Sequence, residues 1–239
     1  MIAFSAAPAS LPPGRRVYAI GDVHGCLDPL ASLHRAVAGD LRDRPVADAC
    51  LIHLGDYIDR GPDSAEVIAT LLGDPVPGTR RINLMGNHEA MMLAALDGGN
   101  DDPAEVWRAN GGADALASWR IGQGTARADW FFRIPAEHLA FIRNLDRMHR
   151  EGGYVFVHAG IRPGVAPEAQ TERDLLWIRE PFLSFAGDLG AVIIHGHTPR
   201  PEPVLRANRI GIDTGMVYGG VLTCAVLEAD QIGFLQVSS

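Results

Sequence analysis

The chain has 239 residues, 47% of them hydrophobic, which is enough to build the core of a globular domain. Its 29 acidic residues outnumber its 21 lysines and arginines, and the net charge of -8 disfavours nucleic acid or an acidic membrane surface as a partner. The three cysteines follow no disulfide or metal-binding spacing, and no uncharged apolar run reaches the roughly 18 residues of a membrane span, so we expect a cytoplasmic protein.

The N-terminal segment, residues 1–14, contains small residues and prolines, and no basic residue precedes its apolar part. It therefore does not resemble a secretory signal. We expect a short flexible tail here, followed by a single domain over residues 15–239.

Five strand-like runs follow along the chain, and each leads into a loop that combines glycine with Asp, Asn or His. The runs are Val17–Ile20, Cys50–Leu54, Ile82–Met85, Tyr154–Val157 and Val192–Ile194. The loops read "GDVHG", "GDYIDRG", "GNHE", "HAG" and "HGHT". Because open sheets with parallel strands hold ligands at the carboxyl ends of those strands, we expect the five loops to converge on one site.

The side chains in these loops are hard oxygen ligands and imidazoles without a thiolate, a set that suits two divalent transition-metal ions. They are Asp22, His24, Asp56, Asn87, His158 and His197. Asp22 and His24 lie two residues apart, so in an extended segment both would face one ion. Asp56 offers two carboxylate oxygens and is our candidate for the ligand that bridges the ions.

The triplet Asn87–Glu89 in "INLMGNHEAMM" also has a plainer interpretation. Asn and Glu both suit the start of a helix, where Asn accepts free backbone N–H groups and Glu complements the helix dipole. One such loop could be a simple turn, but five matching loops favour a functional site.

From about residue 91 to 150 the pattern is helical. Within this region Trp107, Asn110 and Trp119 could line a substrate groove. The alternative is that the aromatic residues belong to the core, as is more usual on amphipathic helices.

The ordered motifs resemble those of the calcineurin-like metallophosphoesterase superfamily. The "DRG" and "GNHE" forms resemble its phosphoprotein phosphatase branch, which includes bacterial and phage-type serine/threonine phosphatases, and the match extends from Gly21 to about Gly220. The resemblance implies an α/β fold in four layers, a double β-sheet sandwich flanked by helices, with one catalytic domain and a helical variable region at about 91–150.

The resemblance also assigns roles to the loop residues. The first ion would be bound by Asp22, His24 and Asp56, and the second by Asp56, Asn87, His158 and His197. His88 would be the general acid, oriented by Asp59. Arg60 presents a planar, permanently charged group that suits two phosphate oxygens.

A second phosphate-binding arginine is expected from the family. We favour Arg179 in "DLLWIRE", although Arg162 and Arg173 are also near His158 in sequence, and Arg179 could instead be a surface residue of a helix.

Two further polar residues have open roles. His195 shares its loop with His197, and we interpret it as a residue behind the ligands or lining the pocket, not as a ligand. Asp213 in "GIDTG" could accept the second N–H of a metal-bound imidazole, or it could be a turn aspartate.

The implied activity is hydrolysis of phosphate monoesters, in which a hydroxide that bridges the metal ions attacks phosphorus directly. We expect phosphoserine or phosphothreonine in proteins as the substrate, with phosphorylated small molecules as the wider class, and manganese as the metal, although iron, zinc, cobalt and nickel accept the same ligands. The alternative is symmetrical hydrolysis of dinucleoside tetraphosphates, because the "GIDTGMVYGGVLT" segment resembles the closing segment of those enzymes as well as that of the bacterial phosphatases. An inactive binding module is disfavoured, because no ligand position is missing.

Overall fold

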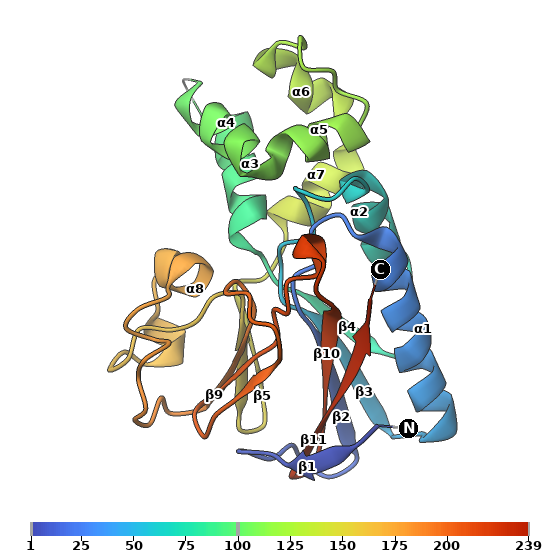
Figure 1. The fold of residues 1–239 in the computed structure, drawn as a ribbon, viewed down its shortest axis with the longest axis vertical. Helices are drawn as coiled ribbons and strands as arrows, with labels where there is room; N and C mark the ends of the chain where they lie inside the picture. The colour runs from blue at the N-terminus through green and yellow to red at the C-terminus, as the bar shows by residue number, and fades with distance from the viewer. Residues whose placement is uncertain (1, 99–100, 239) are drawn as a thin grey trace.

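The computed structural model describes residues 2–98 and 101–238 and contains two sheets that face each other (Figure 1). The first sheet has the order β1 (Phe4–Ala6), β11 (Gln231–Val237), β10 (Leu222–Glu228), β2 (Arg15–Ile20), β3 (Asp48–His53) and β4 (Arg80–Asn83). The second has the order β5 (Met148–Glu151), β6 (Tyr154–Val157), β7 (Val192–His195), β9 (Arg209–Gly211) and β8 (Val204–Leu205). All five predicted strands are present, as β2, β3, β4, β6 and β7.

The alternation of side chains along each strand explains why the sheets stack. In β2, Val17 and Ala19 face the second sheet, where they share an apolar cluster with Tyr154 and Phe156 of β6. Tyr18, from the opposite face of β2, belongs to a cluster with the helices. Each central strand is therefore buried on both faces, and the predicted double β-sheet sandwich is confirmed.

Helices form the outer layers and a separate region beyond the strand ends (Figure 1). The first sheet is covered by α1 (Leu27–Asp43) and α2 (Ser64–Leu72), and the second by α8 (Glu172–Trp177). The helical region comprises α3 (Asn87–Asp97), α4 (Asp102–Trp107), the π turn η1 (Arg108–Gly112), α5 (Ala113–Ser118), α6 (Arg127–Arg133) and α7 (Ala136–Arg143). Two short 3-10 turns are η2 (Pro167–Ala169) and η3 (Met216–Tyr218). Among the described helices, none has the length and apolarity needed to cross a membrane.

The helical region begins and ends earlier than the sequence pattern predicted. Its first helix starts at Asn87, because Gly86 donates its N–H to the Glu89 side chain over 2.9 Å and so caps the helix. At the other end, residues Met148–Glu151 form strand β5, which pairs with β6, so the helical region ends before them. Trp107 and Trp119 are buried, which supports the core interpretation of these residues.

The flexible tail predicted for residues 1–14 is wrong for residues 2–14. Phe4 pairs with Gly233 in an antiparallel ladder, so β1 covers the edge that β11 would otherwise expose. Leu11 is only 5% exposed and lies in the apolar cluster between the sheets. Residues 2–14 are therefore ordered by pairing and burial against the folded sheets. That the chain forms a single catalytic domain stays a prediction.

The direction of the strands places the loops of interest together. In the first sheet β2, β3 and β4 are parallel, and in the second β6, β7 and β9 are parallel. The carboxyl ends of β2, β3, β4, β6 and β7 lead into the five predicted loops.

Candidate metal centre

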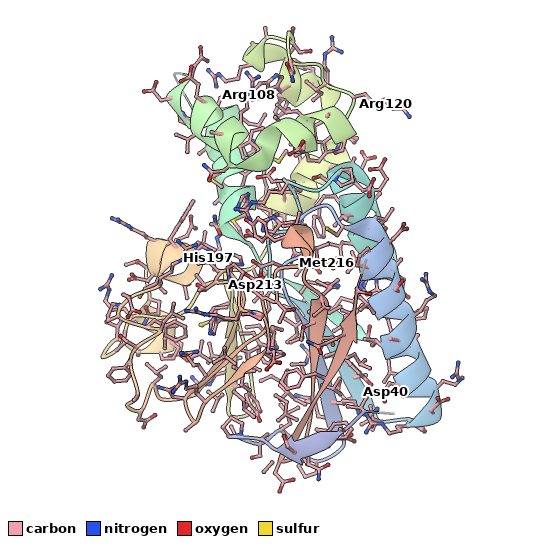
Figure 2. All side chains as sticks on the ribbon, viewed as in Figure 1. Asp40, Arg108, Arg120, His197, Asp213 and Met216 are labelled. Atoms are coloured by element: carbon pink, nitrogen blue, oxygen red, sulfur yellow. The ribbon has the colours of Figure 1, made fainter. Side chains whose placement is uncertain are left out.

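The five loops converge on one buried cluster at the carboxyl ends of the strands, as predicted. Each predicted ligand is at most 8% exposed, and they are Asp22, His24, Asp56, Asn87, His158 and His197. The first sheet contributes four of them, on the three loops that follow β2, β3 and β4, and the second sheet contributes His158 and His197. Figure 2 shows His197 and Asp213 at the junction between the sheets and the helical region.

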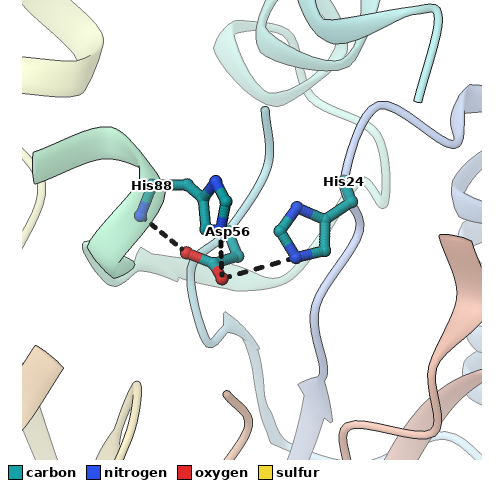
Figure 3. A group of neighbouring side chains, drawn as sticks. All are labelled: His24, Asp56 and His88. Carbon is teal, nitrogen blue, oxygen red and sulfur yellow. Dashed lines mark hydrogen bonds and ion pairs between the residues drawn. The ribbon is translucent and has the colours of Figure 1, made fainter. Parts of the chain in front are cut away.

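Asp56 lies at the centre of this cluster. Its Oδ2 is 3.4 Å from Nε2 of His24 and 3.4 Å from Nε2 of His158, while its Oδ1 accepts the backbone N–H of His88 over 3.0 Å. Figure 3 shows Asp56 between His24 and His88. One carboxylate therefore contacts His24, a predicted ligand of the first ion, and His158, a predicted ligand of the second. A bridging ligand requires this placement.

The two histidines predicted to bind the second ion both approach Asn87. Its side-chain oxygen lies 2.8 Å from Nε2 of His158 and 2.8 Å from Nδ1 of His197. Asp22 is tied to the same region, because its carboxylate accepts the backbone N–H of His197 at 3.1 and 3.2 Å. Oxygen and imidazole donors from three separate loops thus point at one place.

The loops reach this arrangement through left-handed backbone conformations. His24 has φ of 46°, Asp56 of 52° and His197 of 64°, which are uncommon values for non-glycine residues and are found at functional sites. The expectation that Asp22 and His24 lie in an extended segment is therefore wrong. The chain turns at His24 because its N–H, like that of Val23, donates to the carbonyl of Asp56.

Close contact between two loops requires glycine. Gly55 has φ of 101°, and a Cβ at this position would lie 2.5 Å from the backbone nitrogen of Gly86. The "GDYIDRG" and "GNHE" loops can touch only because both side chains are absent.

Hydrogen bonds to the backbone set the tautomers of two histidines. Nδ1 of His24 is 2.9 Å from the carbonyl of Ile58, and Nδ1 of His158 is 2.9 Å from the carbonyl of Leu54, so each ring donates outward and turns the lone pair of Nε2 toward the centre. Burial lowers the pKa of His24 to about 3 and that of His158 to about 4. Both rings are therefore neutral, the form that binds metal ions.

The carboxylates need a compensating charge. Burial raises the pKa of Asp56 to about 7. Burial also raises the pKa of Asp22 well above its usual range, and the neighbouring Asp213 and Asp56 raise it further. Among the residues that the structure describes, two groups of side chains are close enough to hold a cation, His24 with Asp56 and His88, and Asp56 with His158 and His197. The donor set thus fits divalent cations, which would stabilise the charged carboxylates.

His88 and Asp59 form a buried pair. Nδ1 of His88 lies 2.6 Å from Oδ2 of Asp59, and Nε2 is 4.0 Å from Oδ2 of Asp56. Burial lowers the pKa of His88 and raises that of Asp59, so burial disfavours the charged form of each group. Because Nδ1 is engaged by Asp59, Nε2 is the atom that faces the centre, and a proton donor or a ligand could act from there.

Two arginines border the centre. Arg60 Nη1 donates to Nε2 of His24 over 2.6 Å, and the guanidinium lies 5.4 Å from the ring centroid of Tyr218. Arg179 lines the same cavity of about 100 Å³ as Arg60 and His197.

The other arginine candidates lie differently. Arg162 is engaged by Asp174 at 2.6 and 3.1 Å, and it lines the neighbouring cleft together with Arg173. Of the three alternatives, Arg179 is the one that lines the cavity of the metal centre.

The contacts of Asp213 and His195 bear on the roles that the sequence left open. Asp213 lines the cavity, but its carboxylate accepts the N–H of Gly215 over 3.0 Å, as a turn aspartate does. The Nδ1–H groups of His24 and His158 bond instead to the backbone carbonyls of Ile58 and Leu54. The ring of His195 packs 5.0 Å from that of Phe182, and its Nδ1 is 3.0 Å from the carbonyl of Gly196.

Glu89 is a residue whose importance sequence reasoning missed. Oε2 accepts the N–H groups of Asp56 and Gly86 at 2.9 Å each, and Oε1 accepts those of Tyr57 at 2.8 Å and Ile58 at 3.2 Å. The side chain is fully buried. The "GNHE" motif indicates only a helix start at Glu89. In the structure, Glu89 also holds the loop that carries Asp56.

Comparisons with known proteins agree with this geometry. The sequence profile described as calcineurin-like phosphoesterase matches residues 15–227. Serine/threonine-protein phosphatase 1 of Salmonella typhimurium is 33% identical over 230 residues, covering 90% of this chain and 93% of the relative. A symmetrical bis(5'-nucleosyl)-tetraphosphatase of Methylococcus capsulatus is 31% identical over 180 residues, covering 75% of this chain and 51% of the relative.

Solved structures show the same fold. A protein proposed to be a diadenosine tetraphosphatase superposes with a TM-score of 0.65 at 23% identity, covering 95% of this chain and 98% of that one. The cold-active protein-tyrosine phosphatase of a psychrophilic Shewanella superposes with a TM-score of 0.57 at 18% identity, covering 95% and 81%.

Exchange of the central carboxylate should affect metal content more than exchange of a peripheral one. After reconstitution with divalent metal and dialysis, we expect Asp56→Asn to retain less metal than Asp22→Asn, because Asp56 alone belongs to both predicted ligand sets. Metal per chain is measured by mass spectrometry, with the exposed Asp43→Asn as control. Equal metal content in the two site variants would contradict a bridging Asp56.

Glu89→Gln should destabilise the fold although it changes only one atom. Each carboxylate oxygen accepts two N–H groups, so either orientation of the amide turns an NH₂ group toward two donors. We expect a loss of about 3 kcal/mol in the free energy of unfolding of the metal-free protein, measured by urea denaturation. The exposed Glu66→Gln serves as control, and equal stability of the two variants would show that Glu89 does not hold the loop.

Proposed function

Because the chain belongs to the calcineurin-like phosphoesterase family, we propose that it is a metal-dependent phosphatase that removes phosphate from serine and threonine side chains of proteins. The observation that carries this proposal is the match with a serine/threonine-protein phosphatase over 93% of the relative's length. Serine/threonine-protein phosphatase 2 of Escherichia coli, 31% identical over 91% of its length, supports the same substrate class.

The shape around the centre supports a protein substrate. A cleft of about 620 Å³ adjoins the cavity, shares Arg179 with it, and includes Arg173 and the partly exposed Trp177. A peptide could lie in this cleft with its phosphate at the metal centre.

Hydrolysis of dinucleoside tetraphosphates is the second candidate. An asymmetrical tetraphosphatase of Anoxybacillus flavithermus is 28% identical over 87% of its length, so the comparisons support this activity as well, at lower identity. A pocket of about 410 Å³ in the helical region is lined by Arg108, Arg120 and Trp130, but it shares no lining residue with the cavity of the centre. Figure 2 shows both arginines far from His197. We therefore place this activity second.

We propose two bound divalent cations, most effectively manganese. The first would be held by Asp22, His24 and Asp56, and the second by Asp56, Asn87, His158 and His197. When bound, such a pair lowers the pKa of water, supplies hydroxide near neutral pH and offsets the charge of the phosphate.

The protein side chains would then complete the reaction. Arg60 and Arg179 border the cavity and would bind phosphate oxygens, whose charge grows in the transition state. His88 would give its Nε2 proton to the departing serine or threonine oxygen, and Asp59 would hold the imidazole in place. The cysteines of the described chain are all free, in keeping with the proposed cytoplasmic location.

Removal of metal should abolish activity. We expect dialysis against a chelator to lower turnover of 4-nitrophenyl phosphate at least 100-fold, roughly the contribution of a metal-activated nucleophile, and added manganese to restore it more fully than zinc, cobalt or nickel. Enzyme dialysed without chelator is the control. Full turnover by protein shown to be metal-free would refute the proposal.

A substrate panel separates the two candidate activities. We expect kcat/KM for phosphoserine and phosphothreonine peptides to exceed that for diadenosine tetraphosphate by about 10-fold or more, since a tetraphosphatase depends on binding energy from bases that this cavity does not enclose. Products are identified by chromatography. A 10-fold preference for diadenosine tetraphosphate, with ADP as product, would replace the protein-phosphatase proposal by the second candidate.

A further inference from the structure

Trp107, at the end of α4, contacts the pair formed by His88 and Asp59. Its indole nitrogen donates to both carboxylate oxygens of Asp59, at 3.0 Å to Oδ1 and 2.9 Å to Oδ2. Trp107 and Asp59 are both fully buried. The Asp59 carboxylate therefore has two side-chain partners, His88 from the "GNHE" loop and Trp107 from the helical region.

The turn that follows Trp107 contacts Arg60, the neighbour of Asp59. The carbonyl of Gly111 accepts the N–H of Arg60 over 3.2 Å. Gly111 has φ of 108°, and a Cβ there would lie 2.6 Å from Cγ of Arg60. A Cβ on Gly112 would lie 2.6 Å from the Trp107 ring, so the turn closes tightly around the indole.

We propose that Trp107 and the turn Arg108–Gly112 form a positioning element of the catalytic site, in which Trp107 orients the His88–Asp59 pair and Gly111 orients Arg60. This inference rests on the proposed phosphatase function, in which His88 is the proton donor. It assigns to the helical region a part in the chemical step, in addition to any contact with substrate.

The physical basis is the isolation of Asp59 from water. A buried carboxylate is costly unless donors satisfy it, and a hydrogen bond to a charged group is stronger than one between neutral groups. Without the indole N–H, Asp59 could rotate, and the 2.6 Å contact with Nδ1 of His88 would no longer fix the direction of Nε2. Small errors in the direction of a proton donor slow proton transfer strongly.

The competing explanation is that Trp107 is an ordinary core residue. Its ring does pack against Trp130, with centroids 5.9 Å apart. Trp119 offers a matched comparison, because it is a buried tryptophan of the same region whose Nε1 donates to Nδ1 of His138 over 3.1 Å. A purely structural role predicts that Trp107→Phe and Trp119→Phe behave alike.

The experiment measures two phosphate monoesters that differ in their need for a proton. A phosphoserine peptide releases a basic alkoxide, whereas 4-nitrophenyl phosphate releases an anion that is already stable. For Trp107→Phe we expect kcat to fall about 10-fold or more on the peptide and less than about 3-fold on the aryl ester, the loss of one hydrogen bond to a charged group. Trp119→Phe should change both substrates by the same factor, and manganese content should stay normal in both variants.

Gly111→Ala tests the second contact and provides a result should Trp107→Phe fail to fold. The added Cβ would clash with the Arg60 side chain and weaken phosphate binding. We therefore expect KM to rise roughly 3-fold or more on both substrates, without dependence on the leaving group. Folding of every variant is checked by circular dichroism. An unchanged KM would overturn the role of Gly111.

His88→Asn in the same assays separates failure of this inference from failure of the proposed function. If His88→Asn slows both substrates equally, the acid role itself is wrong. If His88→Asn impairs the peptide selectively but Trp107→Phe matches Trp119→Phe, the acid role stands and the positioning role of Trp107 is overturned.

Discussion

Burial of several carboxylates in one small volume is the constraint on which the rest of this structure depends. Asp22, Asp56, Asp59 and Glu89 are each at most 5% exposed. Carboxylates placed away from water need donors or cations, because the desolvation of a charge is otherwise prohibitive. The backbone supplies many of these donors, with four N–H groups on Glu89 alone. The imidazoles and the predicted metal ions complete the balance around Asp56 and Asp22.

The groups that surround Asp56 come together only when both sheets are stacked. Asp56 comes from the first sheet and His158 from the second, and the apolar cluster between the sheets sets their separation. Metal binding is therefore expected to stabilise the sandwich as a whole, because the ligands come together only in the folded state. The strained backbone at His24 and Asp56 is tolerated because surrounding hydrogen bonds determine those conformations.

The helical region contacts the centre at one place and has a separate pocket elsewhere. It forms a pocket of its own, lined by Arg108 and Arg120, and it contacts the catalytic loop through Trp107 and Gly111. Under the proposed function, a change at Trp107 or Gly111 would alter the rate of the reaction without touching the metal ligands.

The sequence by itself determined five central strands and the order of the loops that follow them, and it predicted a set of metal ligands, because ligand chemistry dictates residue type and short-range patterns dictate strand type. Only the tertiary structure decided the place of residues 2–14, the turn at His24 and the partners of Glu89 and Trp107. Trp107 and Asp59 are 48 positions apart, and no local pattern links them. A hydrogen bond between distant segments depends on how whole layers pack, and a buried tryptophan has the same local sequence signal whether its N–H faces a backbone carbonyl or a catalytic carboxylate.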